Sequence, residues 1–270
     1  MGASWQVLKK DKEILVFPLI SGICCLIVIA SFAFPLLATD SWHLPEDDAT
    51  PGQQIAYYAI LFAFYFCNYF VIVFFNSAII ACATIRLRGG DPTVGDGFRM
   101  AAARLPLIFG WALVSATVGL ILRIIEDKSE KLGRFVAGLL GMAWSVISFL
   151  VIPVLVIEKQ SPIGALKEST ALLKKTWGEQ IIGNFNFGFV FFLLNIPAIV
   201  IIILGVMSQN VAIMITCIAA GAIYLLVVAL IQSALQSIFQ AAIYLYAKNG
   251  QVPEGFDTEL LDEAMVLRVK

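Results

Sequence analysis

The chain has 270 residues, of which 60% are hydrophobic and only 14% are charged, with 18 Lys and Arg against 19 Asp and Glu. Soluble globular domains contain about 45–50% apolar and about 25% charged residues, so this chain has too little charge to cover a soluble surface. The composition excludes an ordinary soluble enzyme, a nucleic-acid-binding protein and a disordered protein, and it indicates an all-α polytopic membrane protein.

Six apolar runs are long enough to cross a bilayer, since a membrane helix needs about 20 mainly apolar residues. They lie at residues 14–37, 55–85, 105–125, 135–157, 181–207 and 211–246. The second and sixth runs are longer than a bilayer requires, so they must tilt, kink, protrude or lie partly along the interface. We expect a bundle of six transmembrane helices in one domain over residues 1–250, followed by an acidic cytoplasmic tail over residues 251–270.

The positive charges predict the orientation of these spans. Fourteen of the 18 Lys and Arg residues lie before span one, between spans two and three, between spans four and five, or after span six. The other four, which are Arg123, Lys128, Lys131 and Arg134, lie between spans three and four. Because cytoplasmic loops carry the excess of Lys and Arg, we expect a cytoplasmic (inner) membrane protein with both termini in the cytoplasm.

A short amphipathic segment precedes each odd-numbered span. The clearest is Pro162–Trp177, where Ser161 and Pro162 form a typical helix start. Ser4–Lys10 parallels Ser169–Lys175, and Gly97–Leu105 is a weaker third copy. The pattern predicts three units, each an interfacial helix followed by a two-span hairpin, and the alternative is three unrelated basic anchors.

Basic side chains on these segments are candidate contacts for lipid headgroups, because an amphipathic helix can lie in the headgroup layer with its basic face toward anionic lipid. The candidates are Lys9, Lys10, Arg99, Arg104, Lys167, Lys174 and Lys175.

The middles of the six spans contain no Asp, Glu, Lys, Arg or His. Ionisable residues inside the membrane mark proton relays and charge-coupled transport, and intramembrane proteolysis needs buried carboxylates or a Ser and His pair. The cysteines, at spacings that fit neither a disulfide framework nor a CxxC metal site, lie in apolar runs. We therefore expect no catalytic residue, no metal site and no cofactor.

Neutral polar residues remain inside the predicted spans. Gln232, Gln236 and Gln240 share one face of span six, and Asn184 and Asn186 in span five are candidate partners. Three interpretations stay open: interhelical hydrogen bonds that fix the bundle, an amphipathic helix in the interface, and a polar groove for a lipid headgroup or a small polar solute.

Two stretches carry a family resemblance. One contains Ser4-Trp5, Leu8, Asp11-Lys12, Phe17-Pro18-Leu19 and Ser21-Gly22, and the other contains Pro153, Glu158, Pro162, Ala165, Ser169, Leu173-Lys174 and Trp177-Gly178-Glu179. They resemble a prokaryotic family of six-span inner-membrane proteins of unknown function, whose layout is similar to the membrane region beside some glycerophosphodiester phosphodiesterases. The resemblance implies the fold and topology and assigns no catalytic or binding residue.

These patterns favour a non-enzymatic membrane protein that organises lipid or partner proteins at the cytoplasmic membrane. The alternative is a channel or transporter for a lipid or a neutral polar solute, through a groove lined by Gln and Asn. Membrane lipids are the expected partners, and small residues at four-residue spacing leave a homo-oligomer as an alternative to packing within one bundle. The acidic tail suits a cytoplasmic protein partner, and we expect no nucleic-acid partner.

Overall fold

The computed structural model describes residues 2–38, 50–127, 132–175 and 177–250, and within these residues the fold is all-α, as predicted. The predicted acidic tail at 251–270 lies outside the described residues. The helices are α1 (Gly2–Lys10), η1 (Lys12–Leu15, a 3-10 turn), α2 (Val16–Ala38), α3 (Pro51–Leu87), α4 (Val94–Ala102), α5 (Leu105–Asp127), α6 (Leu132–Ile147), α7 (Val151–Glu158), α8 (Pro162–Lys175), α9 (Trp177–Met207) and α10 (Val211–Asn249).

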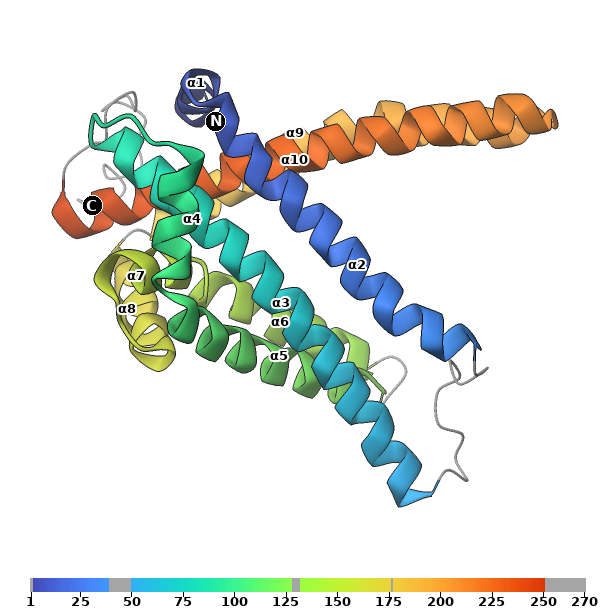
Figure 1. Cartoon of the computed structure of the whole chain (residues 1–270), viewed down its shortest axis with the longest axis horizontal. Coiled ribbons are helices and arrows are strands. Elements are labelled where there is room, and N and C mark those ends of the chain that lie inside the picture. The colour runs from blue at the N-terminus through green and yellow to red at the C-terminus, as the bar shows by residue number, and fades with distance from the viewer. Residues whose placement is uncertain (1, 39–49, 128–131, 176, 251–270) are drawn as a thin grey trace.

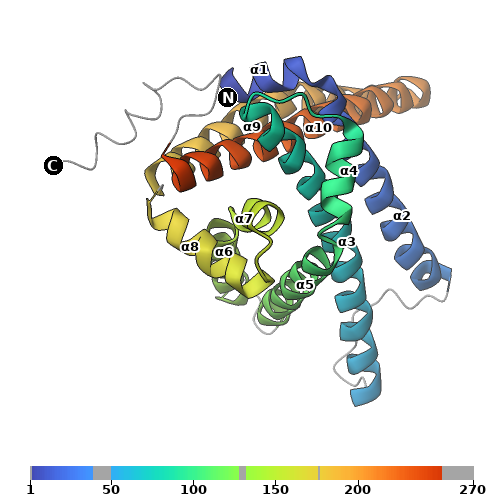
Figure 2. The same cartoon turned by 60° about the vertical axis from the view of Figure 1, so that its left-hand side comes forward.

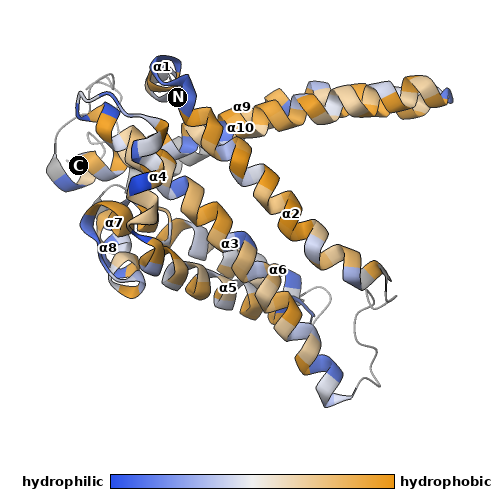
Figure 3. Ribbon diagram, in the orientation of Figure 1, coloured by the Kyte–Doolittle hydropathy of each residue, from blue (hydrophilic) through white to orange (hydrophobic). Residues whose placement is uncertain are grey.

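Six helical segments of the described chain are long and apolar enough to cross a membrane. Four lie in the single helices α3, α5, α9 and α10, the first, Lys12–Pro35, combines η1 with α2, and the fourth, Gly133–Glu158, combines α6 and α7. Figure 3 shows apolar residues along these long helices, with polar residues gathered toward their ends. The six predicted spans thus correspond to six apolar segments whose ends differ from the predicted ones by a few residues.

Three of the long segments form the centre of the molecule. The segments α3, α7 and α10 pack against one another, and each is the second span of a predicted unit. The first spans, α2, α5 and α9, pack outside them against α3, α6 and α10 respectively. The inner halves of the second spans therefore hold the most deeply buried side chains, such as Ile79, Leu155 and Ile238.

The short helices connect the three units into a ring. Helix α4 of the second unit packs on α3 of the first, α8 of the third packs on α7 of the second, and α1 of the first packs on α10 of the third. Figures 1 and 2 show α1, α4 and α8 near the same end of the bundle, around the last turns of α3, α7 and α10. Each short helix thus occupies an equivalent place, on the second span of the preceding unit.

The outer halves of α9 and α10 run side by side away from α2, α3 and α5 (Figure 1). Two glycines let these helices approach closely, since a Cβ atom on Gly205 would lie 2.4 Å from Cβ of Cys217, and one on Gly221 would lie 2.5 Å from Cγ1 of Ile202. Close backbone approach at small residues is a main source of helix association in lipid, where apolar burial gives little driving force. A side chain at Gly205 would push the two helices apart, and one at Gly221 would force the Ile202 side chain to move.

The fourth span is interrupted, which the sequence did not predict. Its apolar run was expected to form one helix over residues 135–157, but α6 ends at Ile147 and α7 begins at Val151. Pro153 lies in the first turn of α7, where its missing N–H costs nothing, whereas in a continuous helix it would leave the Phe149 carbonyl without its donor. The proline therefore favours a new helix start at this place.

Candidate functional site

A cavity of about 510 Å³ lies between the three units, in the region of the interrupted span. Its walls come from α3, α5, α6, α7, α9 and α10, and its lining residues are Tyr69, Ile72, Val73, Trp111, Ser115, Trp144, Ser145, Val146, Ser148, Phe149, Ile152, Gly188, Gln232, Gln236 and Gln240. Ser115 lies about 15 Å along α5 from its first residue, and Gln240 lies about 14 Å from the end of α10, at ~1.5 Å per residue. The cavity therefore lies within the apolar stretches of these helices and away from their ends.

Three glutamines from α10 form the most polar wall of this cavity. Gln232, Gln236 and Gln240 recur every four residues, so a continuous helix projects all three toward the same side. Within the described part of the chain, none of the three side-chain amides makes a hydrogen bond. The three side chains are partly exposed at the cavity, so water or a polar ligand there can supply the hydrogen bonds whose loss in an apolar environment costs roughly 2–7 kcal/mol per amide.

Hydroxyl groups add to the unpaired polar surface. The side chains of Ser115 on α5 and Tyr69 on α3 line the cavity, and among the described residues their hydroxyls also have no hydrogen-bond partner. Ser145 and Ser148 differ, because they donate within their own segment to the carbonyls of Gly141 (3.0 Å) and Trp144 (2.6 Å). Among the described residues, the hydrogen-bonding capacity open to a ligand therefore comes from α3, α5 and α10.

An indole pair forms another part of the wall. The rings of Trp111 and Trp144 stack with their centroids 5.5 Å apart and their planes 15° apart. Trp111 is buried and Trp144 is partly exposed. Together with Phe149 and Ile152, the two indoles form an apolar part of the cavity wall, in contrast to the polar part formed by the glutamine amides.

The interruption in span four borders this cavity through Ser148, Phe149 and Ile152. A residue from another helix satisfies two backbone groups at the interruption. The Ser169 hydroxyl on α8 donates to the Ile147 carbonyl (2.7 Å) and accepts from the Leu150 N–H (3.1 Å). Non-helical backbone at membrane depth is tolerated where protein or a polar cavity satisfies it, and interrupted helices form the substrate sites of many transporters.

The described part of the cavity wall is uncharged, since none of the described lining residues is Asp, Glu, Lys, Arg or His. Within the described ranges, no group of three His, Cys, Asp or Glu side chains could hold a metal ion. The chemistry that this wall offers is hydrogen bonding to neutral groups and apolar contact.

The candidate amides of span five are only partly placed. The backbone of α9 is described, but the side chains of Asn184 and Asn186 lie outside the described residues. Gly188, one turn after Asn184, lines the cavity. The structure thus brings Gln232, Gln236 and Gln240 together at one cavity, and the N-terminal half of α9 lies beside it.

The basic candidates lie on or beside the short helices. Lys9, Lys10, Arg99, Lys167 and Lys174 are exposed, with Lys9 over the ring of Trp5 at 5.6 Å from its centroid. The side chain of Lys175 lies outside the described residues.

Arg104, in the link before α5, makes specific contacts with the protein. Its Nε donates to the Val156 carbonyl (3.1 Å) and its Nη1 to the Ala103 carbonyl (3.2 Å), so it connects the start of α5 with the last turn of α7.

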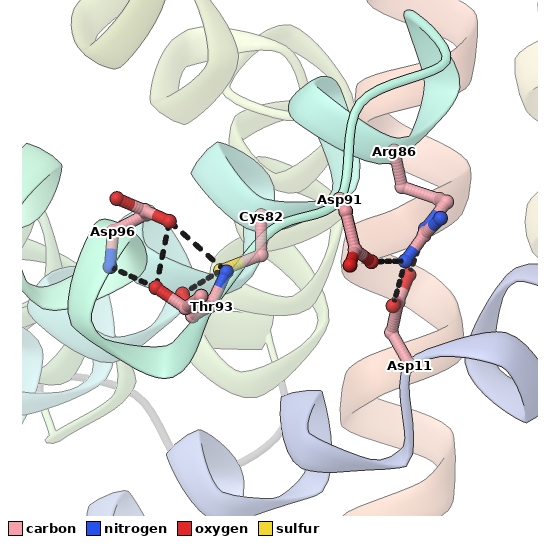
Figure 4. A network of polar contacts seen from close by, with 6 residues as sticks. All are labelled: Asp11, Cys82, Arg86, Asp91, Thr93 and Asp96. Carbon is pink, nitrogen blue, oxygen red and sulfur yellow. Dashed lines mark hydrogen bonds and ion pairs between the residues drawn. The ribbon is translucent and has the colours of Figure 1, made fainter.

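Helix α4, which carries Arg99, begins with a reciprocal cap (Figure 4). Asp96 N–H donates to the Thr93 hydroxyl (3.2 Å), and the Asp96 carboxylate accepts from the Thr93 hydroxyl (2.6 Å) and N–H (3.0 Å). These two hydrogen bonds lower the pKa of Asp96 below its ordinary value of 3.8. The carboxylate therefore stabilises the start of α4 at any pH above that ordinary value.

This stabilisation should disappear as the pH falls through the lowered pKa of Asp96. We expect the amides of α4 to exchange faster with solvent in acid in the wild type, beyond the intrinsic pH effect on exchange. In Asp96→Asn, which has no proton to take up, the protection of α4 should not change with pH over this range. Hydrogen exchange of α4 at a series of acidic pH values measures both, and an identical acid response in the two proteins would contradict the assignment.

Two polar clusters at the end of the bundle where the short helices pack were not predicted from the sequence. Asp11, which is buried, pairs with Arg86 at the end of α3, and Arg86 also pairs with Asp91 (Figure 4).

In the second cluster, Lys248 on α10 pairs with Glu158 (3.0 Å) and Glu168 (2.9 Å), and Tyr244 donates to Glu158 (2.8 Å). Asp11 and Glu158 belong to the stretches that carry the family resemblance, which was the available signal.

Comparison with known proteins places the chain in a family. Residues 55–255, from the second span to just beyond α10, match the family described as "Family of unknown function (DUF6159)". The chain matches no curated protein and no solved structure. The similarity in layout to the membrane region of phosphodiesterases stays a prediction. Because the match covers more than half of the 270 residues, the chain belongs to the Family of unknown function (DUF6159).

Proposed function

We propose that this multi-pass membrane protein binds a lipid or a neutral polar solute inside the bilayer and carries it through the cavity between its three units. The observation behind the proposal is that Gln232, Gln236 and Gln240, with no protein partner among the described residues, face one cavity within the apolar stretch of α10. Amides surrounded by hydrocarbon need partners, and a ligand that enters the cavity can supply them. The interrupted fourth span beside the cavity is the type of element that forms transporter sites.

A second candidate is the organisation of anionic lipid at the cytoplasmic membrane by a protein with both termini in the cytoplasm. The exposed lysines on two short helices, Lys9, Lys10, Lys167 and Lys174, favour it. Exposed basic side chains on an interfacial helix attract anionic headgroups. This candidate needs no ligand in the cavity, so the two functions predict different effects of the same variants.

The triple variant Gln232→Leu/Gln236→Leu/Gln240→Leu tests the proposal. We expect it to fold with equal or higher thermal stability, because unpaired amides are replaced by apolar side chains. We expect lipid to co-purify with the wild type and to be lost from the triple variant, as measured by mass spectrometry of extracts from the purified full-length proteins. Reconstituted vesicles should show the same loss in the transfer of that molecule.

A matched control is Gln54→Leu, which makes the same change on an exposed part of α3 outside the cavity. It should leave bound lipid and transfer unchanged. If the triple variant unfolds at a clearly lower temperature, the amides pack the bundle and the proposal is wrong. Unchanged lipid and transfer in a stable triple variant would also reject it, and loss of anionic lipid only on neutralising the four lysines would favour the second candidate.

A further inference from the structure

We infer that the cavity takes an uncharged group rich in hydroxyls, such as the sugar or glycerol headgroup of a neutral lipid. The inference rests on the proposed function and adds the class of ligand to it. It follows from three properties of the wall: its balance of hydrogen-bond donors and acceptors, its lack of charge, and its division into polar and apolar sides.

The free polar groups of the wall both donate and accept. Each glutamine amide offers two N–H donors and one carbonyl acceptor, and the hydroxyls of Ser115 and Tyr69 do both. A ligand that only accepts, such as a ketone or an ester, would leave the amide carbonyls unpaired. Hydroxyl groups donate and accept at the same atom, so a polyhydroxylated group satisfies the wall from one end of the glutamine row to the other.

The lack of charge disfavours a phosphate. No described residue of the lining is cationic, and a charge brought out of water is costly unless a counter-charge and hydrogen bonds receive it. The cation on α10 that follows the glutamines, Lys248, lies about 12 Å beyond Gln240 at ~1.5 Å per residue and is already paired with Glu158 and Glu168. A phospholipid headgroup would therefore enter the cavity without a partner for its phosphate.

The apolar side favours an amphipathic ligand over a free sugar. Trp144 presents a partly exposed indole, and Ile72, Phe149 and Ile152 continue the apolar surface. An indole covers the C–H faces of a ring or a glycerol backbone with a large flat area, and the aliphatic side chains suit the first segments of an acyl chain. A volume of about 510 Å³ lies within the range of ligand sites, roughly 300–1,000 Å³.

The test measures binding to full-length protein in phosphatidylcholine nanodiscs by native mass spectrometry. The probes are a monoglucosyl diacylglycerol, a phosphatidylglycerol with the same acyl chains, and free methyl glucoside. We expect the glucosyl lipid to bind at least about tenfold more tightly than phosphatidylglycerol, since a charged headgroup has no counter-ion in the wall. Gln236→Leu and Trp144→Leu should each weaken the glucosyl lipid about tenfold, while Ser233→Ala, on α10 outside the lining, should not.

Each outcome decides a different statement. Phosphatidylglycerol that binds as tightly as the glucosyl lipid, and is lost in Gln236→Leu, overturns the neutral class and leaves the proposed function standing. If none of the three probes binds, or if the triple glutamine variant binds them as tightly as the wild type does, both the ligand class and the proposed function are wrong. Methyl glucoside that binds as tightly as the glucosyl lipid supports the hydroxylated class and identifies a soluble polyol as its source.

Discussion

Replacing Ser169 with alanine should lower the free energy of unfolding by about 2–4 kcal/mol. The Ser169 side chain is fully enclosed, and its hydroxyl is the partner of both the Ile147 carbonyl and the Leu150 N–H at the interruption of span four. Alanine leaves one donor and one acceptor unpaired in a buried place, and each such group costs about 1–3 kcal/mol. Thermal or denaturant unfolding of the detergent-solubilised protein measures the loss.

Thr170→Ala is the matched control, one residue along the same helix. The Thr170 hydroxyl donates to the Leu166 carbonyl of its own helix (2.8 Å), a carbonyl that already takes part in helical hydrogen bonding. We expect a loss below about 1 kcal/mol, because the bond only supplements the helix. Equal stabilities of Ser169→Ala and Thr170→Ala would mean that the hydroxyl of Ser169 does not hold the interruption together.

The interruption explains which part of the fold a sequence can predict. Hydropathy identifies the spanning segments, because every spanning backbone must satisfy its own hydrogen bonds, and all six predicted apolar runs correspond to long apolar helical segments. Hydropathy does not predict an interruption of the helix where another segment supplies the missing hydrogen bonds. Pro153 was the local signal, but Ser169, which completes the interruption, lies 19 residues from Leu150 in the chain.

The candidate site, like the fold, was only partly predictable from the sequence. The four-residue period placed Gln232, Gln236 and Gln240 on one face, but whether that face meets another helix, the interface or a cavity depends on α3, α5 and α6. The indole pair of Trp111 and Trp144 joins residues from two helices, so no local pattern could indicate it. The spacing of polar residues along one helix shows which face they share, but it does not show which residues of other helices lie opposite that face.

The residues behind the family resemblance gain a physical meaning from the structure. Asp11 pairs with Arg86, Glu158 pairs with Lys248 and accepts from Tyr244, and Ser169 completes the interrupted span. These contacts join segments far apart in the chain at the end where the short helices lie. These roles are structural, in agreement with a resemblance that implies the fold and topology and assigns no catalytic or binding residue, and the three glutamines of the cavity lie outside those stretches.

Replacing Arg86 with methionine should have a comparably large effect on the first unit. Asp11 is only 8% exposed and its carboxylate faces the Arg86 guanidinium, which is 21% exposed. Removing one partner of a buried ion pair costs about 3–5 kcal/mol, and the partial exposure of Arg86 reduces our expectation to about 2–3 kcal/mol. Because Asp11 lies between α1 and η1, we also expect α1 to separate from α10 more readily, and faster tryptic cleavage after Lys9 or Lys10 measures that opening.

Two further variants separate the ion pair from a general loss of positive charge. Arg88→Met removes a charge two residues along the chain at an exposed side chain without an ion pair within the described residues, so it should change stability by less than about 0.5 kcal/mol. Asp11→Asn in the Arg86→Met background removes the stranded carboxylate, so the double variant should be more stable than Arg86→Met alone. If Asp11→Asn instead adds its own loss in full, the two side chains do not interact, and α1 is held on α10 by apolar packing of Val7 and Leu8 alone.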